Sequence, residues 1–183
     1  MKTFLTGLGA AAVLALMAAD PALARDATNP TPTAVSTAAN EAAMGDLYDR
    51  AGTTDLAAGD YRWFEQISGD DVSVIVDLSE QMAFVYEGHE LMAVSTVSTG
   101  KAGHETPTGS FEILQKREEH YSNLYDDAPM PFMQRLTWDG IALHAGAVKE
   151  QPASHGCVRL PHAFAEKLFG VTTTRQTMVH IVA

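Results

Sequence analysis

The sequence predicts a mainly β fold with one or two short helices. Three short apolar runs, rich in β-branched residues, follow one another about ten residues apart with polar turns between them. A chain of 183 residues with one cysteine can form no intrachain disulfide, so a packed core must hold the fold. We therefore expect one β domain that opens with an antiparallel meander of strands at 72–78, 82–86 and 91–97.

The first 24 residues have the layout of a secretory signal peptide. A basic Lys2 precedes an apolar run over 4–19, and a triplet of small residues at 22–24 ends just before Arg25. A transmembrane anchor is the alternative, but the run is shorter than the ~20 residues that span a bilayer and is broken by glycines. We expect residues 1–24 to be a signal peptide that exports the chain to the periplasm.

Residues 25–60 predict a flexible tether that can include a short helix. Thr, Ala and Pro dominate its first part, and this composition offers too little apolar surface to order the segment. A helix can run from Asn40, as its cap, to Arg50, with one side formed by Met44, Leu47 and Tyr48. Residues 61–71 then lead into the main domain at 72–183.

Four further apolar runs predict strands, and a long polar connection separates the first two. These runs are 111–114, 133–138, 141–144 and 178–182. The connection, 116–131, is polar, aromatic and long for a link between strands. Loops of this kind often cover active sites, although an ordinary surface loop has the same composition.

One helix is expected directly after Cys157. Pro161 is at a favoured position in the first turn, and Gly170 can close the last turn. Apolar residues recur with helical spacing at Leu160, Phe164 and Leu168.

The charge balance excludes some classes of partner. With 12 Lys and Arg against 23 Asp and Glu, the formal net charge is −11, so the basic clusters that bind nucleic acid are not expected. No glycine-rich phosphate loop occurs, so nucleotide binding has no support, and no cofactor is predicted. We interpret the acidic surface as a means of solubility.

The single cysteine is the strongest candidate for chemistry. Cys157 follows Ser154-His155-Gly156, and His144 lies thirteen residues earlier. A neighbouring imidazole can take the thiol proton, and the resulting ion pair lowers the pKa of the thiol. His155 shares a side with Cys157 only if the segment is extended. We favour His144, at the end of a predicted strand, as the base and His155 as a supporting group.

The residues around Cys157 have candidate roles as well. The amides of Gly156 and Cys157 can form an oxyanion hole, because glycine allows an unusual turn and a close approach of substrate. Ser154 can hydrogen-bond nearby backbone and fix that turn. Arg159 can hold a substrate carboxylate, or it can form a structural salt bridge.

Two other interpretations of Cys157 remain. A buried thiol can act as a small apolar residue of the core. A metal site could be built from His144, His155, Cys157 and His162, but their spacing matches none of the usual zinc patterns, so no metal is predicted.

Several segments, in this order, resemble the L,D-transpeptidase catalytic domain of bacterial cell-wall enzymes. Leu143-His144-Ala145-Gly146 and the segment 152–161 are similar to that family's signature. The resemblance extends from 72 to the C-terminus and includes the segments 76–86, 97–109 and 130–136. Residues 72–183 would then be the catalytic domain, and no separate peptidoglycan-binding repeat is evident.

The resemblance implies a mixed β-sandwich or barrel with the cysteine in a cleft beneath a loop. It implies that Cys157 attacks the amide between diaminopimelate and the terminal D-alanine of a peptidoglycan tetrapeptide stem and releases D-alanine. An amine of a second stem would then resolve the thioester as a 3→3 cross-link, and carbapenem β-lactams would be covalent inhibitors. The substrate-binding residues would be Ser154, Arg159, Ala145, Tyr121, Met130 and Phe132.

The chain departs from several relatives of that family after the base histidine. Where those relatives have serine, this chain has Ala145, so any help to His144 must come from a backbone carbonyl. Other outcomes also remain open. Water could resolve the thioester, as in an L,D-carboxypeptidase, or the site could attach or release a wall-linked protein. The fold could also serve as a non-catalytic wall-binding module, whereas a redox role is disfavoured because no second cysteine is present.

Overall fold

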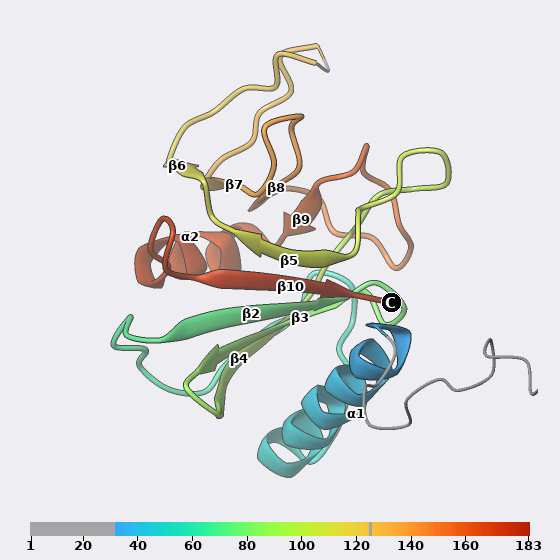
Figure 1. Cartoon of the computed structure of the whole chain (residues 1–183), viewed down its shortest axis with the longest axis vertical. Helices are drawn as coiled ribbons and strands as arrows, with labels where there is room; N and C mark the ends of the chain where they lie inside the picture. Colours follow the sequence, from blue (N-terminus) through green and yellow to red (C-terminus); the bar gives the residue numbers. More distant parts are fainter. Residues whose placement is uncertain (1–31, 125) are drawn as a thin grey trace, which may run out of the picture. The chain divides into compact units, whose positions relative to one another are not determined.

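Two β-sheets and two helices form the part of the chain that the computed structural model describes, residues 32–124 and 126–183 (Figure 1). The predicted signal peptide and the first residues of the predicted tether lie outside the described residues. In the described part, no helix is both long enough and apolar enough to span a bilayer.

The first sheet has six strands in the order β1-β4-β3-β2-β10-β5. Its strands are β1 Tyr61–Trp63, β2 Val72–Asp77, β3 Met82–Glu87, β4 Glu90–Thr96, β5 Gly109–Glu112 and β10 Met178–Val182. The antiparallel pairing of β2 with β3 and of β3 with β4 confirms the predicted meander. The C-terminal strand β10 then joins β2 in parallel, and β5 joins β10 in antiparallel orientation.

Strand β3 is covered on both faces, which explains why it is apolar at nearly every position. Ala83 and Val85 belong to the core between the two sheets. Met82, Phe84 and Tyr86 point the other way and belong to a second cluster that includes Ala43 and Leu47 of the first helix. The alternation of strand side chains therefore supplies both cores from one strand.

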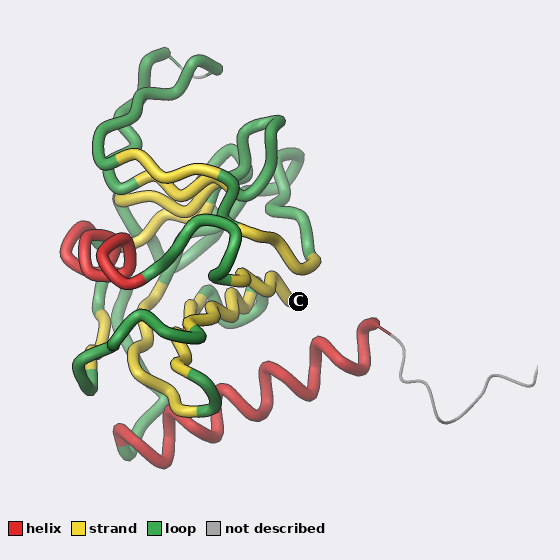
Figure 2. Tube along the Cα trace, turned by 60° about the vertical axis from the view of Figure 1, so that its left-hand side comes forward, coloured by secondary structure: helices red, strands yellow, loops and turns green. Residues whose placement is uncertain are grey.

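The first helix, α1 Pro32–Ala51, covers the outer face of the first sheet (Figures 1 and 2). The sequence predicted a tether up to Asn40 and a short helix capped by that residue. The structure corrects this boundary, because Asn40 lies inside a helix of 20 residues. Leu47 is buried against the sheet, and the Tyr86 hydroxyl donates a hydrogen bond to Asp46 at 2.8 Å. Contacts of this kind stabilise a helix whose first part its own composition does not predict.

The second sheet has four strands in the order β6-β7-β8-β9. They are β6 Gln115–Arg117, β7 Met133–Arg135, β8 Ala142–Ala145 and β9 Val158–Leu160. Strands β6, β7 and β8 are antiparallel, whereas β8 and β9 are parallel. Strand β9 lies between Cys157 and the helix, where the sequence predicted a direct junction.

The second helix, α2 His162–Val171, packs three buried side chains into the core, those of Phe164, Ala165 and Leu168. Pro161, expected in the first turn, is the N-cap residue that directly precedes the helix. Gly170 was expected to close the helix, but it does not. It lies within the last turn, and Thr172 caps the helix with its backbone N–H bonded to the Leu168 carbonyl.

A short segment after β4 joins the two sheets. The backbone of Ser98 exchanges hydrogen bonds with the backbone of Arg159 on β9, at 3.0 and 2.9 Å. The main core lies between the sheets and combines valines of β2 with Leu143, Val158 and Leu160 of the second sheet and with α2. The fold is thus the mainly β, two-sheet arrangement with two helices that the sequence predicted.

Candidate active site

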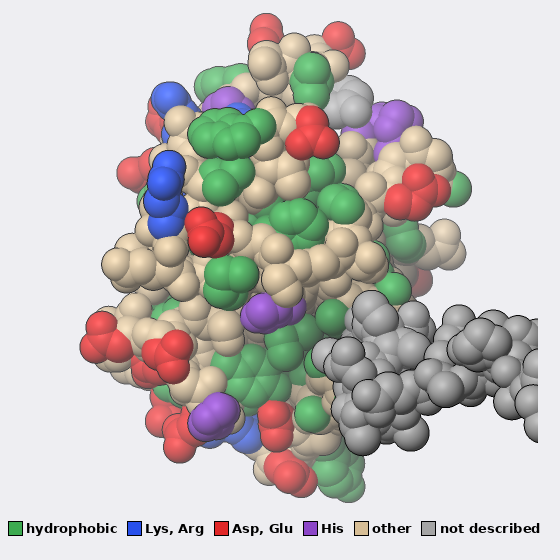
Figure 3. All heavy atoms as spheres, in the orientation of Figure 1, with side chains coloured by type: hydrophobic (Ala, Val, Ile, Leu, Met, Phe, Trp, Pro, Cys, Tyr) green, Lys and Arg blue, Asp and Glu red, His purple; other side chains and the backbone are tan. Residues whose placement is uncertain are grey.

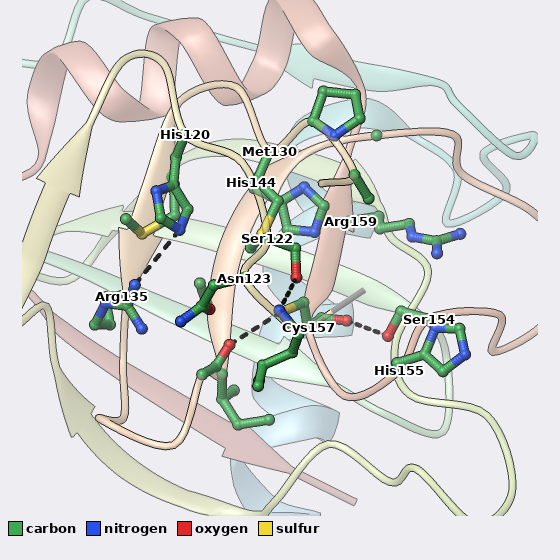
Figure 4. Close-up of a pocket in the computed structure, with 18 of the residues that line it drawn as sticks. His120, Ser122, Asn123, Met130, Arg135, His144, Ser154, His155, Cys157 and Arg159 are labelled. Atoms are coloured by element: carbon green, nitrogen blue, oxygen red, sulfur yellow. Dashed lines mark hydrogen bonds between the residues drawn. The ribbon is translucent and has the colours of Figure 1, made fainter. Parts of the chain in front are cut away.

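A cavity of about 360 Å³ lies over one face of the second sheet (Figure 4). The register pairs Arg135 with Ala142 and His144 with Arg159, and strand side chains alternate between faces. These four side chains therefore project to the same face, and all four line the cavity. Cys157, two residues before Arg159, lines it too. The sheet thus brings the predicted nucleophile and base into one site.

The turn before Cys157 requires glycine. Gly156 has φ +112°, and a Cβ there would lie 2.8 Å from Cδ1 of Ile141. The Ser154 hydroxyl donates to the carbonyl of Cys157 at 2.5 Å and accepts the Gly156 N–H at 3.1 Å. Ser154 therefore fixes the turn. It also occupies the Gly156 amide, so that amide does not serve as the predicted oxyanion donor in this arrangement.

Thr106 holds the same turn from the opposite side. Its hydroxyl donates to the carbonyl of Gly156 at 2.8 Å and accepts the N–H of Gly100 at 2.8 Å. The side chain is only 4% exposed. Because glycine gives the turn backbone freedom, these bonds from both sides are what position Cys157.

Burial favours the protonated form of the Cys157 thiol. Its side chain is half-buried, and Sγ–H donates to the carbonyl of Gly140 at 3.3 Å. Burial raises the pKa of Cys157, while the backbone N–H of Ala142 and the charges of Arg159 and Arg135 oppose that rise. The sequence had predicted a pKa lowered by histidine. The structure corrects this, because desolvation outweighs the favourable charges.

His144 is buried and oriented by backbone. Only 7% of the residue is exposed, and its Nδ1 lies 2.8 Å from the carbonyl of Ala145. A carbonyl only accepts, so Nδ1 carries the proton and Nε2 is left as the acceptor of a neutral ring. Burial lowers the pKa of His144 to about 4, although the bond to Ala145 acts in the opposite direction. Near neutral pH this imidazole is therefore an available base.

The backbone carbonyl of Ala145 orients His144, in the place where several relatives have a serine side chain. The side chain of Ala145 packs in the main core, on the face opposite to the cavity, and is absent from its lining. Ala145 thus acts on the site through its carbonyl, and its predicted side-chain contact with substrate has no place in this geometry.

His155 lies at the rim of the cavity and is exposed. Figure 4 shows it beyond Ser154 as seen from Cys157. Its ring packs edge-on against His104, with centroids 4.8 Å apart. The turn at Gly156 breaks the alternation that would have placed His155 beside the thiol. The geometry therefore favours His144 over His155 as the base.

Arg159 runs along the backbone of Gly146 and reaches the cavity. A Cβ on Gly146 would lie 3.2 Å from Cγ of Arg159, so glycine makes room for the arginine stem. Within the described residues, no carboxylate lies within salt-bridge distance of this guanidinium. Two roles were predicted for Arg159, and the described residues do not form one of them, the structural salt bridge.

The described parts of the connection between β6 and β7, residues 118–124 and 126–132, form a lid over the cavity. Backbone hydrogen bonds link its two arms at Glu118 with Phe132, His120 with Met130, and Ser122 with Ala128. His120, Ser122 and Met130 line the cavity of Cys157. Tyr121 and Phe132 line a neighbouring cavity instead, of about 290 Å³. Tyr121 faces away from Ser122, as alternation along an extended arm predicts, while His120 lines both cavities. Tyr121 and Phe132 therefore do not line the cavity of Cys157, where their contact with substrate was predicted.

The fourth member of the alternative metal set lies elsewhere. His162 packs edge-on against Phe132, with ring centroids 5.2 Å apart, and lines the neighbouring cavity. Within the ranges 32–124 and 126–183, no group of three or more His, Cys, Asp or Glu side chains could hold a metal ion.

Several lining residues were not identified from the sequence. Arg135, His120 and the Gly140 carbonyl all contribute to the cavity around the thiol. The alternation along the predicted strand 133–138 was a usable signal, because Arg135 shares a face with Met133, which packs near Cys157. His120 and Gly140 depend on contacts between distant segments and had no such signal.

The site has the arrangement of a cysteine-type acyl-transfer centre, with a thiol and a neutral imidazole facing one cavity. The sequence model of the YkuD family, described as the L,D-transpeptidase catalytic domain, matches residues 71–181. The chain belongs to this family. Helix α1 and strand β1 precede the matched region.

Solved structures of L,D-transpeptidases share the fold. The chain is 21% identical to one from Mycobacterium smegmatis, with a TM-score of 0.57, over 62% of this chain and 59% of that chain. A second, from Stackebrandtia nassauensis, is 27% identical with a TM-score of 0.57, over 75% of this chain and 65% of that chain. A third, LdtMt1 in complex with imipenem, is 22% identical with a TM-score of 0.57, over 62% and 59%.

This chain therefore covers less than two thirds of the length of each of these three proteins. A comparison with curated proteins found no match.

Proposed function

We propose that the chain is an exported L,D-transpeptidase that acts on peptidoglycan tetrapeptide stems through a thioester at Cys157. The observation that carries the proposal is the neutral imidazole of His144, whose unprotonated Nε2 belongs to the same cavity as the thiol. Membership of the L,D-transpeptidase family supplies the class of substrate.

In the proposed reaction, Nε2 of His144 takes the proton of the thiol as Sγ attacks the carbonyl between diaminopimelate and D-alanine. The C–N bond breaks, and the same proton passes to the departing amine of D-alanine. The side-chain amine of a second stem then attacks the thioester, forms the new amide and gives one proton to His144, which returns it to Sγ. The product is a 3→3 cross-link, and the enzyme is restored.

The oxygen of the tetrahedral intermediate needs a hydrogen-bond donor. Since Ser154 occupies the amide of Gly156, the amide of Cys157 is the remaining donor of the predicted pair. Arg159, which has no carboxylate partner among the described residues, would hold a substrate carboxylate beside the thiol.

Mass spectrometry of the purified mature protein tests the proposal. Wild type, Cys157→Ala and His144→Ala would be incubated separately with tetrapeptide stems and with imipenem, the ligand named in one structural relative. We expect a covalent adduct and D-alanine release with wild type and neither with Cys157→Ala or His144→Ala. Ser154→Ala, treated in the same way, should lose only part of its acylation.

Analysis of the peptide products then separates the alternatives. Dimers with 3→3 links support transpeptidation, whereas shortened stems without dimers indicate hydrolysis. If wild type forms no adduct and releases no D-alanine, the enzymatic assignment is overturned and a wall-binding module is favoured. Recovery from the periplasm of a chain that begins at Arg25 would support export.

A further inference from the structure

Arg135 occupies a position across the sheet from the thiol. Arg135 pairs with Ala142 on β8. Leu143 pairs with Val158 in the parallel register of β8 and β9, so one residue earlier Cys157 lies on the other side of Ala142. The two Cα atoms are thus about 10 Å apart, since neighbouring strands are spaced by about 4.8 Å. In Figure 4, Arg135 and Arg159 lie on opposite sides of Cys157.

The guanidinium of Arg135 is held in place without a charged partner. Its Nε donates to Gln115 at 3.3 Å, and a terminal nitrogen lies 3.5 Å from Nε2 of His120. Burial and the charges of Arg135 and Arg117 lower the pKa of His120, so this ring is a neutral acceptor. Arginine has five N–H donors, and contacts with the described residues use two of them.

The missing carboxylate partner is unexpected in so acidic a chain. The formal net charge is −11, and acidic side chains lie at many separate places on the face shown in Figure 3. Among the described residues, however, no carboxylate lies within salt-bridge distance of Arg135. Asp139 also lines the cavity, but it is exposed and makes no ion pair with either arginine. A half-buried guanidinium with free donors is stabilised when a ligand anion completes its bonds.

We propose that Arg135 is an anion-binding residue of this cavity and receives a carboxylate of the peptide substrate on the side of Cys157 opposite to Arg159. Gln115 and His120 keep the guanidinium aimed into the cavity. The ligand class is a peptide with a carboxylate on each side of the amide that is attacked. The identity of the substrate rests on the proposed function, whereas the anion site itself does not.

Alkylation of Cys157 by two similar reagents measures the anion site directly. Iodoacetate and iodoacetamide both form an S–C bond while the C–I bond breaks and iodide leaves, but only iodoacetate is charged. The rate with iodoacetate divided by the rate with iodoacetamide is independent of any change in the pKa of the thiol, because such a change affects both rates equally. We expect this ratio, normalised to N-acetylcysteine, to fall about tenfold in Arg135→Gln, as for the loss of one charge-assisted contact.

Arg117→Gln is the matched control, because it removes the same charge from the neighbouring strand at an exposed residue outside the cavity. Its rate ratio should equal that of wild type. An Arg135→Gln ratio equal to that of wild type would overturn the proposal, provided that iodoacetamide still labels Cys157 in both proteins. A fall of the same size in Arg117→Gln would also overturn it, since general charge would then explain the effect.

Kinetics with stem peptides test the substrate assignment separately. For D-alanine release, Arg135→Gln should raise KM about tenfold with kcat little changed. A peptide in which the recognised carboxylate is replaced by a carboxamide should show the same KM with both proteins. If wild type releases no D-alanine while the alkylation ratios behave as expected, the proposed function fails and the anion site stands.

Discussion

At the scale of single residues, burial keeps the thiol of Cys157 and the imidazole of His144 both uncharged. The pKa of the thiol is raised and that of His144 is lowered to about 4, so the resting pair is neutral rather than a thiolate with an imidazolium. In the proposed reaction, the thiol proton passes to His144 as Sγ attacks the substrate carbonyl. Such a site protects its one cysteine from reaction with chance electrophiles.

The pH dependence of alkylation tests this neutral pair. The rate of iodoacetamide labelling of Cys157 should rise with pH through a midpoint above the value of about 8.5 typical of free cysteine. N-acetylcysteine labelled under the same conditions is the reference. A rate that is already constant from pH 6 upwards would show a thiolate paired with imidazolium and contradict the expectation.

The sequence was sufficient to identify the turn that holds Cys157, although it misjudged the amide of Gly156 and the place of His155. Cys157, Ser154 and Gly156 form one turn, and the absence of serine at position 145 correctly indicated a backbone carbonyl as the partner of His144. Arg135 and His120 were missed because their places depend on strand order and register, which join segments far apart in the chain.

At the scale of elements, the same distinction separates the strands. The meander β2-β3-β4 was predicted because its strands are consecutive and joined by short turns. Strands β1, β6 and β9 were missed because each has only three residues, too few to show a period. The equally short β7 was found because it begins the longer predicted run 133–138. Helix α1 was placed too late because its first half contains few large apolar side chains, and its stability comes from packing on the sheet.

Replacement of Leu47 by alanine tests whether α1 belongs to the folded domain. The side chain is 1% exposed and packs against the first sheet, so its loss should lower the free energy of unfolding by about 2–5 kcal/mol. Urea denaturation measures this change. Tyr48→Ala is the control in the same helix, because Tyr48 is 61% exposed and should change stability by less than about 0.5 kcal/mol. Equal stability of the two variants would show that α1 does not pack as described.

At the scale of the whole molecule, the buried imidazole links stability to pH. The pKa of His144 is about 4 in the folded chain and about 6.5 in an unfolded one, so between these values the unfolded chain binds more protons. The stabilisation from neutral His144 is therefore complete above about pH 6.5 and is lost as pH falls toward 4.

Denaturation at two pH values measures this linkage. The free energy of unfolding should fall by about 2 kcal/mol between pH 7 and pH 5 through His144. His144→Gln is the control, and the difference in pH dependence between the two proteins isolates this residue from the other titrating groups. Identical pH dependence of wild type and His144→Gln would contradict the buried, neutral state.

The carbonyl that orients His144 has a genetic consequence. A backbone atom is present whichever amino acid is encoded at position 145, so no missense change at that codon deletes the hydrogen-bond acceptor. A substitution there changes the side-chain volume in the core instead, where Ala145 is 3% exposed. For the proposed reaction, random mutagenesis would thus identify the codon of Cys157, whose loss removes the nucleophile, and the codon of His144, whose loss removes the proton transfer. It would not identify the third partner, the carbonyl of Ala145.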